Sequence, residues 1–280
     1  MALHAPATAE QTALAWATRA DDGVLGAFEG DRLVGAANVY PFSLSVPGGE
    51  RIAAAGLSGV SVLPTHTRRG ILTGLMAAGF ERAREQAQAV SCLWASEPGI
   101  YGRFGYGVAT HGLHWTLARS AGGFRHGIAG NASDGAVELL DQPDVAVLAP
   151  IYESLATSTP GVIDRTAAWW DRRLHDPEGT LLAAVADGGY ALYRVTGGWS
   201  EKGPDHTLHA YEVVAPDPAA YARLWRYLLD VDLVDTVSAG HRPVDEPLQW
   251  MVESPRLMRR RFGEGMWVRL LDIAAALPAR

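Results

Sequence analysis

One segment of the sequence combines residue types that bind phosphate. A run of apolar residues ends at Pro64, passes Arg68, Arg69 and Gly70, and continues into a pattern typical of a helix. The first turn of a helix offers unpaired backbone N–H groups and the positive end of the helix dipole. Gly70 permits close approach of the backbone, and the two arginines add positive charge. The segment therefore predicts a site for a phosphate or pyrophosphate group.

Two common nucleotide-binding motifs do not fit this segment. A P-loop needs a lysine and then a hydroxyl residue directly after its last glycine, whereas Ile71 and Leu72 occupy these positions after Gly70. A dinucleotide fingerprint needs three glycines at fixed spacing, and only Gly70 and Gly74 are present. The alternative to a phosphate site is a simple helix start, with the arginines solvated or paired to Glu81 or Glu85.

The elements around this segment predict an α/β domain. Leu72, Leu75, Met76 and Phe80 recur at three- and four-residue spacing, which indicates a helix with one apolar face. A short polar turn at residues 29–31 separates two strand-like runs, as in a hairpin. In chain order we expect the strands Gly23–Phe28, Arg32–Tyr40 and Arg51–Leu63, a helix from about Gly70 to Gln88, a strand Ala89–Ala95, a glycine-rich corner Ser96–Gly107 and a strand Val108–Leu117.

A linker and a second domain are expected after this point. Residues 119–135 are rich in Gly, Ser, Asn and Asp and follow neither the helix nor the strand period. We therefore expect domains at 1–118 and 136–280, joined by the linker 119–135. Helix again follows strand in the second half, which lacks a second Arg-Arg-Gly turn. The expected elements there are the helices Pro143–Thr157, Thr166–Asp176 and Pro218–Asp230, and the strands Leu181–Ala186, Tyr190–Val195, Thr207–Val214 and Met266–Leu271.

Composition limits the class of protein. The 280 residues are 48% hydrophobic and 20% charged, which excludes a disordered chain. Cys92 is the only cysteine, so an internal disulfide framework is excluded and a reducing, cytoplasmic location fits. We expect no membrane partner, because the apolar runs are too short to span a bilayer. The net charge of −7 disfavours a nucleic-acid partner and favours a cationic substrate. His111 and His114 are expected on opposite faces of one strand, so no metal site is predicted.

Two longer segments resemble the Gcn5-related N-acetyltransferase (GNAT) superfamily and, within it, the Eis (enhanced intracellular survival) branch. Gly59–Leu72 is similar to the acetyl-CoA motif of that branch, and Trp94–Gly107 is similar to its catalytic corner. The resemblance continues through Trp169-Trp170, Arg242–Asp245 and Trp267–Ala276, so it covers nearly the whole chain. It implies an α/β (α+β) tandem fold, in which one acetyl-CoA-binding GNAT domain precedes a degenerate GNAT-like domain.

The resemblance also implies roles for individual residues. In the superfamily one strand separates from its neighbour and lies along the pantetheine arm of the cofactor, while the following turn binds the pyrophosphate. The positions near the end of the next strand lie beside the cofactor. The cofactor-binding residues implied for acetyl-CoA are Val60, Ser61, Val62, Arg68, Arg69, Gly70, Ile71, Leu72, Thr73, Ser96 and Glu97.

A tyrosine in the glycine-rich corner is the candidate catalytic residue. Acetyl transfer expels a thiolate, which leaves poorly at neutral pH without a proton donor. Tyr101 lies between Gly99 and Gly102, and the matching tyrosine of the branch is its general acid. From the residues alone, Tyr106 is a competing candidate, and packing is the alternative role for either side chain.

The resemblance implies direct transfer of acetyl to a primary amine of a cationic acceptor. The implied acceptor is an aminoglycoside or another polyamine-like compound, with aminoglycosides first, and the lysine side chain of a protein is the second acceptor class. Branch members are commonly hexamers, so a homo-oligomer is expected. They generally begin before the segment matching Ala13 and continue past residue 280 into a sterol-carrier-like domain, whose final carboxylate is the general base. We expect this chain to lack both parts, so the alternatives are a catalytically impaired acetyl-CoA-binding or assembly protein, or a fragment of a longer enzyme.

Overall fold

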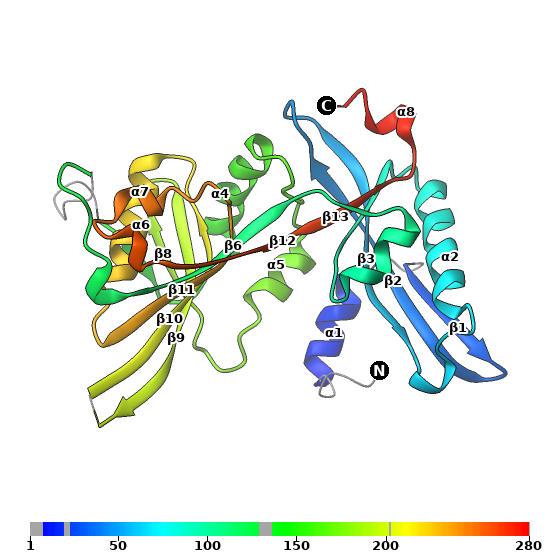
Figure 1. The fold of residues 1–280 in the computed structure, drawn as a ribbon, viewed down its shortest axis with the longest axis horizontal. Helices are drawn as coiled ribbons and strands as arrows, with labels where there is room; N and C mark the ends of the chain where they lie inside the picture. The colour runs from blue at the N-terminus through cyan, green and yellow to red at the C-terminus, as the bar shows by residue number, and fades with distance from the viewer. Residues whose placement is uncertain (1–7, 20–22, 129–135, 202, 280) are drawn as a thin grey trace. The chain divides into compact units, whose positions relative to one another are not determined.

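The computed structural model describes residues 8–19, 23–128, 136–201 and 203–279 (Figure 1). These residues form two compact units. Unit 1 contains the described residues of 1–110, 156–175 and 265–280, and unit 2 contains those of 111–155 and 176–264. The chain therefore leaves each unit and returns to it, so neither unit is one continuous stretch of sequence.

Unit 1 is built on a six-stranded sheet with the order β1-β2-β3-β4-β13-β5. Only β3 and β4 run parallel, and the other neighbours are antiparallel. The expected hairpin and the expected third and fourth strands are confirmed. The strands are β1 (Val24–Glu29), β2 (Arg32–Ser45), β3 (Arg51–Val62), β4 (Val90–Trp94), β13 (Met266–Leu270) and β5 (Gly107–Val108). The helices are α1 (Ala9–Ala17), α2 (Ile71–Glu85), α3 (Pro98–Tyr101), α5 (Ala167–Leu174) and α8 (Ile273–Ala276), with 3-10 turns at Pro64–His66 and Gly102–Phe104.

Helix α2 connects the parallel strands β3 and β4 and packs on β1, β2 and β3 (Figure 1). Its apolar face is the one that the spacing predicts, since Leu75, Met76 and Phe80 are buried. These side chains pack against Val39 and Leu57 from the strands. A strand, a crossover helix and a parallel strand thus place the start of α2 at the end of β3, which is where the phosphate-binding residue types lie.

The expected domain boundaries differ from the two units. The strand expected at Val108–Leu117 is two strands, β5 in unit 1 and β6 (His111–Ala118) in unit 2. The strand expected near the end of the second domain is β13, which lies between β4 and β5 in the sheet of unit 1. The physical reason is that the backbone edge of β4 is completed by a segment distant in sequence. Residues 129–135 of the expected linker lie outside the described residues.

Unit 2 holds a seven-stranded sheet with the order β12-β6-β11-β10-β9-β8-β7, in which only β10 and β11 are parallel. Helix α6 (Pro218–Asp230) joins these two strands and buries Tyr221, Leu224 and Trp225 in the core. The strands are β12 (Arg259–Glu264), β11 (Val234–Arg242), β10 (Gly203–Val214), β9 (Gly189–Ser200), β8 (Leu182–Ala186) and β7 (Glu138–Leu140). Helix α4 (Val145–Ser158) begins in this unit, which also contains α7 (Leu248–Met251) and 3-10 turns at Arg119–Ala121 and Pro255–Leu257.

Candidate active site

Strands β3 and β4 separate part-way along their length. Their parallel pairing runs only from Ala54 to Gly56 on β3. Strand β4 pairs with β13 along its whole length on its other edge, while Leu57–Val62 of β3 pairs with β2 and has no strand on its other edge among the described residues. An unpaired strand edge presents N–H and C=O groups that can bond an extended ligand. Val60, Ser61 and Val62 lie on this free stretch and are half-buried.

A bulge in β3 occurs at the start of the free stretch. The register between β2 and β3 shifts between Ala36 and Asn38. Gly59 lies at this shift with φ +61°, and a Cβ atom there would collide with the side-chain nitrogen of Asn38. Both the left-handed backbone and the close approach favour glycine at this position. The bulge follows the last residue that pairs with β4, so it lies where the two strands diverge.

The start of helix α2 has no side-chain cap. Gly70 is its N-cap, with φ +81°, and has no side chain that could accept a hydrogen bond from the first amides of the helix. The first intrahelical N–H bond is that of Gly74, so the amides of Ile71, Leu72 and Thr73 lack intrahelical acceptors. The first turn contains no acidic residue, whereas Arg82 and Arg84 lie in the last turn. The positive end of the dipole is therefore not compensated within the helix.

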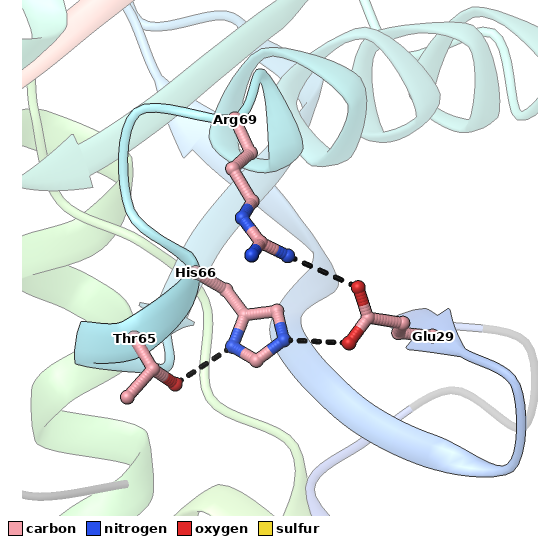
Figure 2. A network of polar contacts seen from close by, with 4 residues as sticks. All are labelled: Glu29, Thr65, His66 and Arg69. Carbon is pink, nitrogen blue, oxygen red and sulfur yellow. Dashed lines mark hydrogen bonds and ion pairs between the residues drawn. The ribbon is translucent and has the colours of Figure 1, made fainter.

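A carboxylate from the hairpin holds the turn before α2. Figure 2 shows Glu29 at the end of β1, bonded by Oε1 to NH1 of Arg69 and by Oε2 to Nε2 of His66, each at 3.0 Å. The alternative pairing of the arginines to Glu81 or Glu85 is thus wrong for Arg69. The hydrogen bond to His66 and the charge of His66 lower the pKa of Glu29 below its usual value of 4.5, and Arg69 adds a smaller lowering effect. No local sequence pattern marks Glu29 or His66 as part of this turn, because the two residues lie 37 positions apart in the chain.

The turn also contains a residue in an unusual backbone conformation. Arg68 has φ +62°, which is uncommon for a residue with a side chain. Its side chain is exposed, and no ion pair of it is found in the described part of the chain. Arg68 and Arg69 therefore differ: Arg69 is held by Glu29, and Arg68 places an exposed positive charge at the start of α2.

The candidate tyrosine lies in a helical corner after β4. Ser96 and Glu97 are exposed and follow the strand, and Glu97 is the N-cap of α3, which ends at Tyr101. Tyr101 is half-buried, and its ring meets the ring of Tyr106 edge-on at 6.1 Å. Burial, and then the charge of Glu97, raise the pKa of Tyr101 above 10. The phenol therefore stays protonated at neutral pH, so that it has a proton to donate there.

The competing tyrosine has a structural role. Tyr106 is 4% exposed, its hydroxyl lies 2.7 Å from Oγ of Ser91, and its ring packs against Phe80 at 6.0 Å. Burial raises its pKa well above the ordinary value. A phenol so enclosed has its hydrogen-bonding partner inside the core. Of the two tyrosines, Tyr101 is the one with an accessible surface.

Strand β13 supports the corner from a distant part of the sequence. Arg269 donates a hydrogen bond to the carbonyl oxygen of Phe104, and its guanidinium lies 4.0 Å from the centre of the Phe80 ring. The corner closes at Gly105, which has φ +80°. No sequence signal links Arg269 to this corner, because strand pairing brings it there.

The matching helix start in unit 2 is closed. Strand β10, helix α6 and the parallel strand β11 repeat the arrangement of β3, α2 and β4. Helix α6, however, has Asp217 as its N-cap, and Oδ1 of this residue accepts a hydrogen bond from the amide of Ala219 at 2.7 Å. A carboxylate at the helix start satisfies a free amide and repels a second anion. Of these two helix starts, that of α2 is therefore the one suited to phosphate.

The two histidines of strand β6, His111 and His114, have neighbours from unit 2. His111 stacks on Phe262 at 4.9 Å in unit 2, and burial followed by the charge of Arg261 lowers the pKa of His114. Among the described residues, no three His, Cys, Asp or Glu side chains gather as metal ligands would. No described helix combines the length and the apolar character that crossing a membrane requires.

Comparisons with known proteins agree with this geometry. A family model described as an acetyltransferase (GNAT) domain matches residues 2–109, and a second model with that description matches residues 161–270. The N-acetyltransferase Eis of Mycobacterium tuberculosis is 34% identical over 96% of this chain and 69% of its own length. The chain belongs to the GNAT family, in its Eis branch. The expected tandem fold of two GNAT domains is thereby confirmed.

Two further relatives support this assignment. An uncharacterized N-acetyltransferase of Streptomyces avermitilis is 36% identical over 95% of this chain and 68% of its own length. The crystal structure of Eis1 from Mycobacterium abscessus aligns with a TM-score of 0.83 at 36% identity, over 95% of this chain and 68% of that chain. The chain thus spans about two thirds of the length of these relatives. GNAT enzymes take the acetyl group from acetyl-CoA, and the free edge of β3 and the open start of α2 suit its pantetheine and pyrophosphate parts.

Proposed function

We propose that this chain transfers acetyl from acetyl-CoA to a primary amine of a cationic acceptor. The observation that carries the proposal is the uncompensated start of α2 directly after the free edge of β3, in a chain of the GNAT family. The donor-binding residues of the proposal are those expected from the sequence, namely Val60–Val62, Arg68–Thr73, Ser96 and Glu97.

The donor site combines three kinds of contact. The free edge of β3 at Val60–Val62 offers backbone groups to the two amides of pantetheine. The amides of Ile71, Leu72 and Thr73 face the pyrophosphate as an array of donors at a helix start. The guanidinium groups at the turn add charge, which matters because a pyrophosphate carries more than one negative charge.

The chemical step needs a donor of one proton. The amine nitrogen attacks the acetyl carbonyl carbon, a C–N bond forms, and the C–S bond breaks. The acceptor ammonium first loses one proton to the solvent, which frees the lone pair of its nitrogen. The leaving sulfur takes the proton of the Tyr101 hydroxyl, and the proton that the nitrogen loses on forming the amide returns to the phenolate through the solvent, so that Tyr101 is regenerated and charge balances. A phenol whose pKa lies above 10 is protonated throughout the neutral range, as this role requires.

Charge supports a cationic acceptor. The chain has a formal charge of −7, and the exposed carboxylate of Glu97 is close enough to Tyr101 to raise its pKa. An ammonium group approaching this corner is attracted by both. We place aminoglycosides first, then polyamine-like compounds and protein lysines. A homo-oligomer and a cytoplasmic location stay predictions.

Calorimetric titration with acetyl-CoA, followed by measurement of thiol release with an aminoglycoside, tests the proposal. Cys92 gives little background with a thiol reagent, because it is 1% exposed and burial raises its pKa to about 12. Binding with release is the expected result. If acetyl-CoA binds but none of the three acceptor classes causes thiol release, the result would favour an impaired acetyl-CoA-binding protein. If acetyl-CoA does not bind, the proposed donor site is refuted.

A further inference from the structure

We propose that Glu29 is a positioning residue for the donor site. Its carboxylate holds both His66 and Arg69 and so sets the turn that precedes α2 (Figure 2). The proposal rests on the proposed function, because the turn is the pyrophosphate site of that function. Glu29 lies on the β1–β2 hairpin, 37 residues before His66 and 40 before Arg69.

His66 is the buried member of the network. It is 5% exposed and closes the 3-10 turn that follows β3. A buried polar ring needs partners for both nitrogens. Nε2 lies 3.0 Å from Oε2 of Glu29, and Nδ1 lies 2.8 Å from Oγ1 of Thr65. Removal of the carboxylate would leave Nε2 without its acceptor in a site largely shielded from water.

The roles of donor and acceptor follow from the chemistry of the partners. An ionised carboxylate only accepts hydrogen bonds, so Nε2 of His66 carries a proton. The Thr65 hydroxyl can donate to Nδ1 when the ring is neutral or accept from it when the ring is charged. The bond to Glu29 therefore persists in both states of His66. The lowered pKa of Glu29 keeps the carboxylate ionised under neutral conditions.

Arg69 is the exposed member of the network. The side chains of Arg69 and Glu29 are 54% and 63% exposed, and an ion pair at such a surface contributes little to stability. The ion pair instead orients the side chain of Arg69. A free arginine side chain samples many rotamers, and a fixed carboxylate selects among them. A guanidinium has five N–H groups, so the bond to Glu29 leaves others available for a phosphate oxygen.

The backbone between the two anchored residues explains why positioning is needed. Arg68 has φ +62° and Gly70 has φ +81°, so the turn passes twice through the left-handed region. A residue with a side chain adopts this conformation only when its surroundings impose it. His66 and Arg69 flank Arg68 on either side, and Glu29 ties both to the hairpin. The network thus restrains the residues from which the amides of α2 begin.

Two variants separate orientation from charge. Glu29→Gln keeps the length of the side chain but has one acceptor and one donor group, so it can serve only one of the two partners. Glu29→Asp keeps the charge and both acceptors but is shorter by one methylene, so it cannot reach both partners. Glu81→Gln is the control, because it removes the same charge from an exposed site on α2.

The experiment compares two donors. The dissociation constant of acetyl-CoA is measured by calorimetry, and that of S-acetylpantetheine, which lacks the pyrophosphate, by its displacement of acetyl-CoA. Both Glu29 variants should weaken the binding of acetyl-CoA about tenfold, or about 1.4 kcal/mol, as expected for the loss of one charge-assisted hydrogen bond. Binding of S-acetylpantetheine should change less than about twofold, and Glu81→Gln should change neither. In an Arg69→Ala background, the effect of Glu29→Gln should shrink.

The outcomes distinguish this proposal from the proposed function. If the parent chain does not bind acetyl-CoA, the proposed function fails and this proposal fails with it. If the parent binds and both Glu29 variants bind acetyl-CoA equally well or more tightly, only the positioning role is overturned, because the carboxylate would then act merely through its charge or not at all. An equal loss for both donors would also overturn it, since it would indicate general distortion of unit 1.

Discussion

Replacing Tyr101 with phenylalanine removes one hydroxyl group and leaves the ring. The edge-on contact of the ring with Tyr106 at 6.1 Å remains, so the corner keeps its packing. A general acid contributes about 10²–10⁴-fold to a rate, and most when its pKa lies near the working pH. Burial and Glu97 raise the pKa of Tyr101 above 10, away from neutrality. We therefore expect a loss at the lower end, about 100-fold in kcat, or about 2.7 kcal/mol.

The assay is thiol release at saturating acetyl-CoA, together with calorimetric binding of the donor. The dissociation constant of acetyl-CoA should stay within about twofold of the parent value, because the lost proton donor acts in the transition state. A kcat for Tyr101→Phe within about threefold of the parent would refute the role of the hydroxyl.

Tyr106→Phe is the matched control. It removes the same atom from a tyrosine that is 4% exposed and bonded to Ser91 at 2.7 Å. Ser91 keeps its hydrogen bond to the carbonyl oxygen of Ala55 at 3.1 Å. We expect about 1 kcal/mol less free energy of unfolding in a denaturant titration, and a kcat close to that of the parent. The opposite pattern, with kcat lost only in Tyr106→Phe, would exchange the two roles.

The pH dependence of kcat gives a second test of the same role. The protonated phenol is the active form, and it is lost as the pH rises through the pKa of Tyr101. Because that pKa is raised above 10, the limb of the profile that belongs to Tyr101 should lie above pH 10 and should vanish in Tyr101→Phe. A limb due to Tyr101 near pH 7 or 8 would contradict the direction of the shift.

Three further predictions follow from named contacts. Replacing both Arg68 and Arg69 with alanine should weaken acetyl-CoA binding more than tenfold in calorimetry, which is about 1.4 kcal/mol or more. Thermal stability should change little. Unchanged affinity would mean that the turn is only the start of a helix and binds no pyrophosphate. Glu246→Ala should lower the free energy of unfolding by about 3–5 kcal/mol, because it leaves the buried Nε of Arg242, which donates to Glu246 at 2.8 Å, and the Tyr221 hydroxyl without their acceptor. A loss below about 1 kcal/mol would show that water reaches the two donors. Cys92 should react with a thiol reagent only after denaturation, and rapid reaction of the folded chain would contradict its burial.

Much of the candidate site could be predicted because its determinants are local. The buried face of α2 follows from the spacing of Leu75, Met76 and Phe80, which meet on one side of any helix. The start of the helix is marked by Gly70, whose backbone is left-handed in the structure, a conformation that glycine adopts readily. The hairpin of β1 and β2 follows from a short polar turn between two strand-like runs. Each signal links residues within a few positions of one another, so the linear sequence contains it.

The sequence by itself therefore determined the hairpin of β1 and β2, the strand–helix–strand order of β3, α2 and β4, the apolar face of α2 and the residue types at its start. The tertiary structure alone decided that Glu29 holds Arg69, that Tyr106 is enclosed while Tyr101 keeps an accessible surface, and that β13 with Arg269 completes the sheet of unit 1. The physical reason is that strand edges pair through backbone groups, which are the same in nearly every residue. Their pattern along the chain does not specify which distant edge they meet, and only packing of the whole unit selects the partner.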